Sequence, residues 1–600
     1  MRTRVRDGLL ATQVSSAATT AEKTTPWLDA HAAAWREHRT AACMNATVHH
    51  TWDPATLDKA LWCLDEQRLE LTALVEELAT ADGSVVDKAI AAAAGLGPVS
   101  SCMDATVLAG MPDPPGDDIR PKVAEIRVAL ARSEGLDRTG KFAEGLEIAR
   151  SARQAAEQLA WPPLLADAWF NEAALLLGMK ETRASEEAGM AAYASAARSH
   201  DWQSAASAAT LILCVLAGLD MRLPEARTWA MHAEVAIHHA GDPLQLRESH
   251  RLNCLGHIAK SEAKAGEARA LYERAMAIRE RVQGSEHPRT ATLIHNLGNT
   301  ASDQSEYPEA KTLYERALRI RERALGPEHP ETLSSLARLA HTYLLMGEYA
   351  ESRALYERWR DIKTATLGPE HPELIAGLAG LGELYEATGE YAQAKEIYER
   401  ALAMTEKKRG PDDVRVSYPL ARVGRINAIM GQTAEAKALL TRALVIREKG
   451  LGPEQFDIAP VLLDLADAYH STGEYEEAKA LHSRGLAILE KALPSEEPDL
   501  AFPLTGLGVT LVALDDSAGA LVHLERAVAL RTGKKLAPSL LAASRFALAR
   551  ALWDAPEVAG RDRGRARALG EQARDGFAEN GAGSKTAWAE ADAWLAAHPG

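Results

Sequence analysis

The stretch LYERALRIRERALGPEHPETL, residues 313–333, occurs three times in the chain with small changes. It returns 42 residues later as LYERWRDIKTATLGPEHPELI, and it stands 42 residues earlier as LYERAMAIRERVQGSEHPRTA. A fixed period of this length is typical of repeat proteins, in which one supersecondary unit is stacked many times. The stretch therefore predicts a repeat array rather than a single compact core.

Three columns of residues keep this 42-residue phase along the chain. The first column is mostly tyrosine or leucine: Tyr272, Tyr314, Tyr356, Tyr398, Leu440, His482 and Leu524. The second is small: Ala268, Ala310, Ser352, Ala394, Ala436, Ala478 and Ala520. The third is Leu-Gly or close to it, as in Leu255-Gly256, Leu297-Gly298, Leu381-Gly382 and Leu507-Gly508. Small residues let paired helices approach closely, so a bulky residue there is expected to cost roughly 1–3 kcal/mol by overpacking.

Each repeat has the pattern of two helices. After Pro330, apolar residues stand three to four positions apart, which places them on one face of a helix. Proline suits the first turn, and Gly347 is placed to end this helix. The second helix carries an arginine column among glutamates, for which we expect solvated side chains or i,i+4 ion pairs. This column is Arg274, Arg316, Arg358, Arg400, Arg442, Arg484 and Arg526.

Helix pairs with this Leu-Gly and Ala-x3-Tyr spacing resemble tetratricopeptide repeats (TPRs). The 42-residue period and the L-G-P-E-H-P loop resemble the longer kinesin-light-chain type, closely over 250–532 and more weakly over 119–249. The resemblance implies an all-α fold, a right-handed TPR superhelix (an α-solenoid of helix pairs) preceded by a small helical domain. Terminal repeats of such arrays need a different outer face, so a capping helix is expected at the C-terminal end.

These patterns predict six segments. They are a flexible N-terminal segment at 1–26, a small Trp/Cys-rich helical domain at 27–109, a linker at 110–118, degenerate TPR-like helix pairs at 119–249, regular 42-residue TPRs at 250–532, and a degenerate TPR with its capping helix at 533–600. The linker GMPDPPGDD is rich in proline and glycine, which interrupt helices.

The segment before the repeats has a resemblance of its own. WLDAHAAAWREHRTAACMNAT (27–47), ALWCLDEQRLELTALVEELATAD (60–82) and VVDKAIAAAAGLGPVSSCMD (85–104) resemble the region that follows the kinase domain in large bacterial TPR-containing serine/threonine protein kinases. HHTWDP (49–54) departs from that pattern. The chain shows no kinase glycine loop, H-R-D or D-F-G motif. The resemblance therefore implies the non-catalytic, sensing or docking half of such a kinase.

The cysteine pattern gives little indication of disulfides or of a metal centre. There are five, an odd number, with no C-x-x-C pair, so buried thiols are expected and a disulfide framework or zinc site is not. The kinase resemblance adds one alternative: in an oxidising compartment, Cys43, Cys63 and Cys102 could include a disulfide. The tryptophans of this segment are expected in its helical core.

Charge and hydropathy limit the environment and the partners. The net charge of −16 argues against nucleic acid, because phosphate binding needs an excess of Lys and Arg. Residues 1–25 show no signal-peptide pattern, and the apolar run at 208–219 is too short to span a bilayer. The sequence as written predicts a cytoplasmic protein without membrane insertion. The alternative, drawn from the membrane-anchored kinase relatives, is an extracytoplasmic location.

In TPR proteins the first helices of successive pairs line a concave groove. The equivalent positions form the predicted peptide-binding groove: Asn253, His257, Lys260, His295, Asn299, His341, Glu383 and Arg425. Amide and imidazole side chains can bond a peptide backbone, so docking is expected within 250–346. The equivalent positions of the C-terminal third are Phe502, Thr505, Val509 and Val512. The apolar patch around Phe502 and Val509 is the rival site and would suit self-association or an amphipathic helix. The alternative is a groove that is only solvated and binds no partner. No cofactor or metal is predicted. His250, His257, His295 and His341 could hold a metal ion only if their helices brought them together, and nothing in the sequence shows this.

The sequence thus predicts a non-enzymatic protein-interaction scaffold or sensor that binds a peptide or protein partner. The alternative is a regulatory arm of a serine/threonine kinase system whose kinase domain is absent from this chain. An unrecognised enzyme is the third reading, and no nucleophile–base or metal constellation in the sequence supports it.

Overall fold

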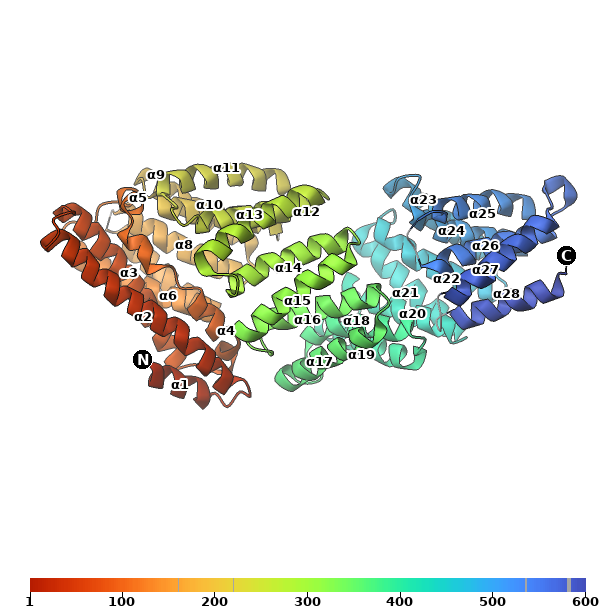
Figure 1. The fold of residues 1–600 in the computed structure, drawn as a ribbon, viewed down its shortest axis with the longest axis horizontal. Helices are drawn as coiled ribbons and strands as arrows, with labels where there is room; N and C mark the ends of the chain where they lie inside the picture. Colours follow the sequence, from red (N-terminus) through yellow and green to blue (C-terminus); the bar gives the residue numbers. More distant parts are fainter. Residues whose placement is uncertain (160, 219–220, 535–536, 580–583, 600) are drawn as a thin grey trace. The chain divides into compact units, whose positions relative to one another are not determined.

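The protein is represented by a computed structural model that describes residues 1–159, 161–218, 221–534, 537–579 and 584–599. It divides into two compact units, Met1–Met346 and Gly347–Gly600. Within the described residues every regular element is helical, as the resemblance implied (Figure 1). The prediction of an all-α fold built from stacked helix pairs is confirmed for the described residues.

The first unit contains α1 (Arg2–Ala11), α2 (Ala17–Thr47), α3 (Pro54–Ala79), α4 (Gly83–Ala94), the 3₁₀ turn η1 (Val99–Met103), α5 (Ala105–Ala109), α6 (Arg120–Thr139), α7 (Phe142–Glu157), α8 (Pro162–Gly178), α9 (Thr182–Arg198), α10 (Trp202–Gly218), α11 (Leu223–Ala240), α12 (Leu246–Ser261), α13 (Ala265–Gln283), α14 (Pro288–Asp303), α15 (Tyr307–Ala324) and α16 (Pro330–Leu345).

The second unit contains α17 (Tyr349–Leu367), η2 (Pro372–Leu374), α18 (Ile375–Ala387), α19 (Tyr391–Arg409), η3 (Val414–Val416), α20 (Ser417–Ile429), α21 (Thr433–Leu451), η4 (Phe456–Ile458), α22 (Ala459–Ser471), α23 (Tyr475–Ala492), η5 (Pro498–Leu500), α24 (Ala501–Ala513), α25 (Ser517–Arg531), α26 (Pro538–Asp554), η6 (Glu557–Ala559), α27 (Arg563–Glu579) and α28 (Lys585–Ala597).

The N-terminal residues are part of the packed core. Helix α1 buries Val5 and Leu9 completely, in one cluster with Leu74 and Leu78 of α3. A Cβ atom on Gly8 would lie 2.4 Å from the Ala79 carbonyl oxygen, so α1 approaches the end of α3 closely. The flexible segment predicted at 1–26 is therefore wrong: the burial of these apolar side chains holds the segment in place.

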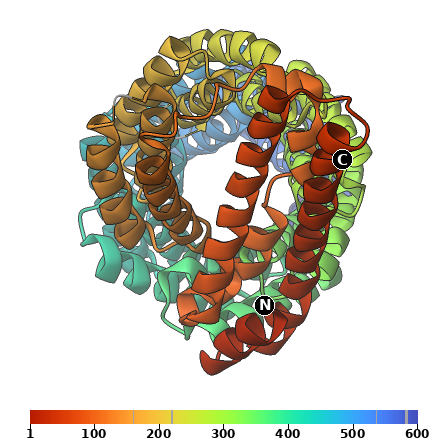
Figure 2. The same cartoon turned by 90° about the vertical axis from the view of Figure 1, so that its left-hand side faces the viewer.

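The long helices α2 and α3 run side by side, drawn red to orange in Figure 2. Helix α3 also packs along α6, the first helix after the predicted linker. Three ion pairs join them: Arg120 with Asp58, Arg127 with Glu66, and Arg138 with Glu70. Residues 1–109 thus belong to the same compact unit as the helix pairs up to Met346.

The phased columns of the sequence are the contact points inside each helix pair. The alanines of the small column, such as Ala268 and Ala394, are fully buried. The glycine of the Leu-Gly column faces the tyrosine column, because a Cβ on Gly298 would lie 2.8 Å from Tyr314 Cε1. The expected close approach of paired helices is confirmed at these positions.

The histidine of the L-G-P-E-H-P loop caps the next helix. His287, His329 and His371 each accept a hydrogen bond through Nδ1 from the backbone N–H two residues later, at 3.1, 3.2 and 3.3 Å. In the following repeat Asp413 Oδ1 takes over, accepting from the Arg415 N–H at 2.9 Å. Asp is a common N-cap residue, so the loss of His-Pro in that loop keeps the capping function.

The arginine column links neighbouring repeats rather than neighbouring turns of one helix. Arg316 Nη2 lies 2.5 Å from Glu280 Oε1, and Arg442 Nη2 lies 2.7 Å from Glu406 Oε1, a separation of 36 residues in each case. Arg484 and Arg526 pair in the same way with Glu448 and Glu490. The expectation of solvated or i,i+4-paired arginines is corrected for these four, since the acidic partner stands on the preceding second helix.

A second basic column was missed in the sequence, although it keeps the same phase. Its members are Arg279, Arg321, Lys363, Arg447 and Arg531, all buried or half-buried near the end of a second helix. Arg321 Nη1 donates to the Glu331 carbonyl at 3.0 Å and to Ser335 Oγ at 2.7 Å, and Arg531 Nη1 donates to the Leu540 carbonyl and Ser544 Oγ, each at 2.8 Å. These arginines satisfy backbone and hydroxyl groups where one pair meets the next.

Candidate functional site

The predicted groove asparagines are bonded within the repeat array. Asn253 Oδ1 accepts from Asn296 Nδ2 at 2.9 Å, and Asn299 Oδ1 accepts from the Tyr314 hydroxyl at 2.7 Å. Both are half-buried. Asn253 lies on α12 and bonds Asn296 on α14, the first helix of the next pair, whereas Asn299 of α14 bonds a tyrosine of α15, the second helix of its own pair.

The other predicted groove residues of the first unit also have partners. His257 Nδ1 lies 3.2 Å from the Tyr272 hydroxyl, and Lys260 Nζ lies 3.2 Å from Asp303. His295 is buried against Ser335 Oγ at 3.3 Å, and burial, aided by nearby Arg321, lowers the pKa of His295 to about 3. His341 is half-buried and has interactions of its own.

Glu383 and Arg425 lie in the second unit. Glu383 accepts from the Tyr418 hydroxyl at 2.6 Å and from Arg422 at 3.1 Å. Arg425 is exposed and lies 2.9 Å from Glu386 Oε1 and 3.5 Å from Asp464 Oδ1. The eight predicted residues are thus divided between the two units, and docking within 250–346 stays a prediction.

The second unit contains a large hollow, which we call the C-terminal hollow. Its volume is about 880 Å³, and its walls come mainly from the first helices α20, α22, α24 and α26. Three large apolar side chains in its walls remain open to solvent: Ile429 at 45%, Phe456 at 44% and Phe502 at 46% exposure. Thr505 and Val509 line it as well, so both residues of the rival patch, Phe502 and Val509, meet there.

Charged side chains alternate with these apolar ones. Asp464 and Asp467 of α22 face the hollow, with Arg425 beside Asp464. Asp467 lines the hollow and keeps 71% of its side-chain area accessible. Desolvation, with the neighbouring charge of Asp464, raises the pKa of Asp467 to about 7. The carboxyl group would be stabilised in its charged form by a cation brought from outside.

Histidine and arginine side chains complete the walls. His482 Nε2 lies 3.5 Å from Asp467 Oδ1, and burial lowers the pKa of His482 to about 4, so the ring is neutral at pH 7. Its Nδ1 is buried without a hydrogen-bond partner among the described residues. The Arg531 guanidinium lies 4.4 Å from the centre of the Phe502 ring, a cation–π geometry. The walls combine apolar surface with a few polar groups, which is the usual composition of a ligand site.

Four of the five cysteines form disulfides, which corrects the expectation of buried thiols. Cys63 is bonded to Cys102, and Cys214 to Cys254. The first bond lies within the segment for which the kinase resemblance had left a disulfide open. The second joins α10 to α12, and Cys43 is free and exposed. A spacing of about 40 residues places these cysteines on helices that pack together, a signal that counting cysteines did not use.

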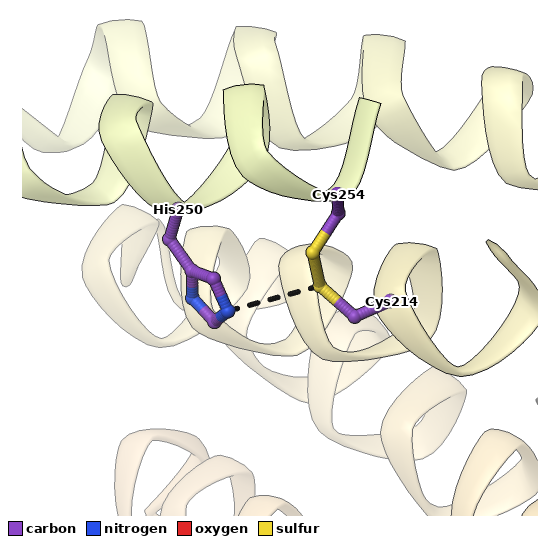
Figure 3. Close-up of side chains that lie close together, drawn as sticks. All are labelled: Cys214, His250 and Cys254. Carbon is purple, nitrogen blue, oxygen red and sulfur yellow. Dashed lines mark hydrogen bonds between the residues drawn. A yellow bond between two sulfur atoms is a disulfide. The ribbon is translucent and has the colours of Figure 1, made fainter. Parts of the chain in front are cut away.

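His250 lies beside the second disulfide (Figure 3), with its Nε2 3.8 Å from Cys214 Sγ. Within the described part of the chain, Cys214, His250 and Cys254 are the one group of three ligand-type side chains whose donor atoms all lie within 4.8 Å of one another. Because the two sulfurs are bonded to each other, neither is a thiolate that could hold a metal ion. His257, His295 and His341 are not brought to this group.

No helix in the described ranges is both long enough and apolar enough to cross a membrane.

The tetratricopeptide repeat family model matches residues 248–323, 293–365, 331–407 and 417–491. A comparison with curated proteins found no match. Among solved structures, kinesin-light-chain TPR-like repeats from Podosopora anserina are 29% identical, with a TM-score of 0.31, covering 34% of this chain and 97% of theirs. BtubC (BKLC) from P. vanneervenii is 22% identical with a TM-score of 0.33, covering 38% of this chain and 94% of its own.

The quorum sensor NprR from B. thuringiensis, in its apo form, is 13% identical with a TM-score of 0.44, covering 69% of this chain and 99% of its own. The residues matched by the family model include the phased alanine, tyrosine and Leu-Gly columns as far as Ala478 and His482, and the helix pairs that these columns build. Residues 248–407 and 417–491 are therefore tetratricopeptide repeats.

Proposed function

We propose that the protein is a non-enzymatic interaction scaffold that binds a peptide segment of a protein partner in the C-terminal hollow. The observation that carries this is the meeting of three solvent-open apolar side chains, Ile429, Phe456 and Phe502, with an under-neutralised carboxyl group, Asp467, in one hollow. An amphipathic segment with a lysine or arginine beside its apolar face would satisfy both features.

The polar groups of the first unit support this choice of site. The asparagine and histidine side chains at 253–299 already bond one another and neighbouring tyrosine and serine side chains. A peptide docking there would have to replace those bonds, which leaves little net gain because each new bond breaks an old one. In the C-terminal hollow, burying exposed apolar area contributes about 25 cal/mol per Å² without breaking a protein contact.

The test is selection of peptides from a random display library on the intact chain, followed by affinity measurement of the selected sequences by calorimetry. We expect sequences that place a basic residue next to leucine or aromatic residues. Val509→Asp should abolish their binding, because it puts a charge into the apolar part of the wall, where the peptide would bury it. Asp467→Asn should weaken basic peptides about tenfold and leave neutral analogues unchanged.

The matched comparison is the Asn253→Ala plus Asn299→Ala double variant, checked for folding by circular dichroism. If that variant loses the selected peptides while Val509→Asp retains them, the partner docks within 250–346 and the C-terminal hollow is the wrong site. Self-association through Phe502 and Val509 is a further outcome, which sedimentation of the peptide-free chain would reveal. The kinase-linked role stays a prediction that depends on sequence resemblance alone.

A further inference from the structure

A second, smaller hollow lies in the first unit and has a different chemistry; we call it the arginine hollow. Its volume is about 290 Å³. One wall is formed by α3, the loop after α4 and η1, and the facing wall by α10, α12, α13 and the start of α14. The hollow thus lies where the N-terminal helices meet the repeats, within one compact unit.

Three guanidinium groups line the arginine hollow: Arg247, Arg279 and Arg289. The one carboxylate among the lining residues is Asp242, and both of its oxygens are engaged. Oδ1 accepts from the Leu246 N–H at 3.1 Å and Oδ2 from the Glu248 N–H at 3.0 Å, so Asp242 caps α12. The lining is therefore positively charged in a chain whose net charge is −16.

The partners of these arginines are neutral. Arg247 donates to Gln203 Oε1 at 3.3 Å, and Arg289 to the Gly95 carbonyl at 3.4 Å. Arg279 donates to Ser249 Oγ at 3.1 Å, Gln283 Oε1 at 2.9 Å and the Leu246 carbonyl at 3.3 Å. Among the residues described, no carboxylate lies at ion-pair distance from any of the three. Neutral acceptors leave the positive charge only partly compensated, since the carboxylates of Asp242, Asp201 and Glu331 act from beyond ion-pair distance.

The surroundings make that charge unfavourable. Burial lowers the pKa of all three arginines, and that of Arg279 falls to about 10, with Arg289 nearby as a second cause. Burial, followed by the charges of Arg279 and Arg289, also lowers the pKa of His250 to about 4. His250 and Arg289 keep accessible surface although protein surrounds them, which is the situation of side chains that face a cavity. Gln67 Oε1 is buried in the opposite wall without a donor from any described residue.

We propose that the arginine hollow binds a small dianionic oxyanion, either phosphate or a phosphomonoester, between Arg247, Arg279 and Arg289. The guanidinium fork matches the oxygens of such an anion in a bidentate way, and the bonds are charge-assisted. Two negative charges would offset the excess positive charge of the lining. The small volume suits a compact anion and excludes a peptide segment, so this site is independent of the C-terminal hollow.

Binding would also add a link between α14 and the loop after α4. Arg289 lies at the beginning of α14 and bonds the Gly95 carbonyl, which belongs to the loop after α4. An anion held by Arg247, Arg279 and Arg289 would neutralise three mutually repelling groups at this junction. The bound anion is therefore expected to slow opening of the segment 95–103, and its effect should be visible in stability as well as in binding.

The experiment uses the intact chain in buffers of constant ionic strength. Calorimetry measures binding of inorganic phosphate, phenyl phosphate, sulfate and malonate, and hydrogen exchange follows the peptides that cover 95–103. Arg247→Gln and Arg289→Gln each remove one guanidinium and one hydrogen bond, to Gln203 Oε1 and to the Gly95 carbonyl respectively. Arg289→Lys keeps the charge and removes the fork. The matched control is Arg323→Gln, which removes an exposed arginine from the same unit.

We expect phosphate to bind and to slow exchange at 95–103. Each glutamine variant should weaken phosphate about tenfold or more, the lysine variant less, and Arg323→Gln by under about twofold. Preference of phenyl phosphate over free phosphate would identify the monoester as the source, and the reverse would identify the free ion; both outcomes support the site. The proposal is overturned if no dianion binds, if malonate binds and phosphate does not, or if the two glutamine variants bind phosphate as tightly as the unaltered chain.

Discussion

At the scale of single residues, the repeat is held by a glycine that faces an aromatic ring. A Cβ atom on Gly256 would lie 2.5 Å from Tyr272 Cε1, and one on Gly382 would lie 2.5 Å from Tyr398 Cε1. Both tyrosines are fully buried. The rings have no room to move aside, so the glycine sets how closely the two helices of a pair approach.

Gly256→Ala should therefore destabilise the pair α12–α13 by about 1–3 kcal/mol, since the overpacking exceeds the gain in helix propensity of about 1 kcal/mol. The measurement is native-state hydrogen exchange of peptides from this pair, because long repeat arrays do not unfold in two states. Gly266→Ala in α13 is the matched control, with nothing within 4 Å of its Cβ position, and it should leave exchange equal or slower. Equal effects of the two substitutions would contradict the packing role of Gly256.

At the scale of elements, one helix carries two arginines with different tasks. Arg316 of α15 pairs with Glu280 at 2.5 Å while a third of its side chain stays exposed. Arg321, five residues later, is 3% exposed and bonds the Glu331 carbonyl, the Ser335 hydroxyl and the Glu331 carboxylate. Arg316 forms an ion pair on the surface, whereas Arg321 is buried at the junction between α15 and α16.

Arg321→Ala should lower the local stability of α15–α16 by about 2–4 kcal/mol, because it leaves a buried carbonyl and a buried hydroxyl without their donor. Arg316→Ala on the same helix should cost under about 1 kcal/mol, as exposed ion pairs do. Hydrogen exchange of α16 peptides would measure both. Similar losses for the two variants would mean that the buried column has no special part in joining the repeats.

At the scale of the whole molecule, two sets of titratable groups oppose each other. Burial lowers the pKa of His250, His287 and His482 from 6.5 to about 4. Burial raises the pKa of Glu70 from 4.5 to about 8, with the nearby Glu134 charge as a second cause, and desolvation raises that of Asp467 from 3.8 to about 7.

The signs predict a plateau of stability. Below pH 6.5 the unfolded histidines bind protons that the folded ones do not, so their contribution to stability falls as the pH decreases toward 4. The carboxyl groups of Glu70 and Asp467 act in the opposite sense: between about pH 4.5 and 8 the folded state binds more protons, so their destabilising effect grows as the pH rises. The free energy of unfolding should change little between about pH 4.5 and 6.5, fall toward pH 4 and fall toward pH 8.

Melting midpoints measured across pH 4 to 8 at constant ionic strength would test this. Asp467→Asn should flatten the decline on the alkaline side, because the amide does not titrate. A melting midpoint that rises steadily from pH 6.5 to 8 in the unaltered chain would show that Glu70 and Asp467 do not destabilise the folded state when they become charged.

The sequence alone determined the repeat and most of its helices, because the 42-residue columns record contacts that are made inside each pair or with the next pair. Such short-range contacts leave a periodic trace, as Gly298 and Tyr314 show. The sequence also contains the buried basic column and cysteine pairs separated by 39 and 40 residues. Neither feature could be interpreted from the sequence, because the helix that each residue contacts was unknown. The docking of α1 on α3 and the arginine hollow depend on contacts between segments far apart in the chain, and no period records them. Only the tertiary structure decided these features, since burial and charge compensation depend on which distant helix comes to lie opposite.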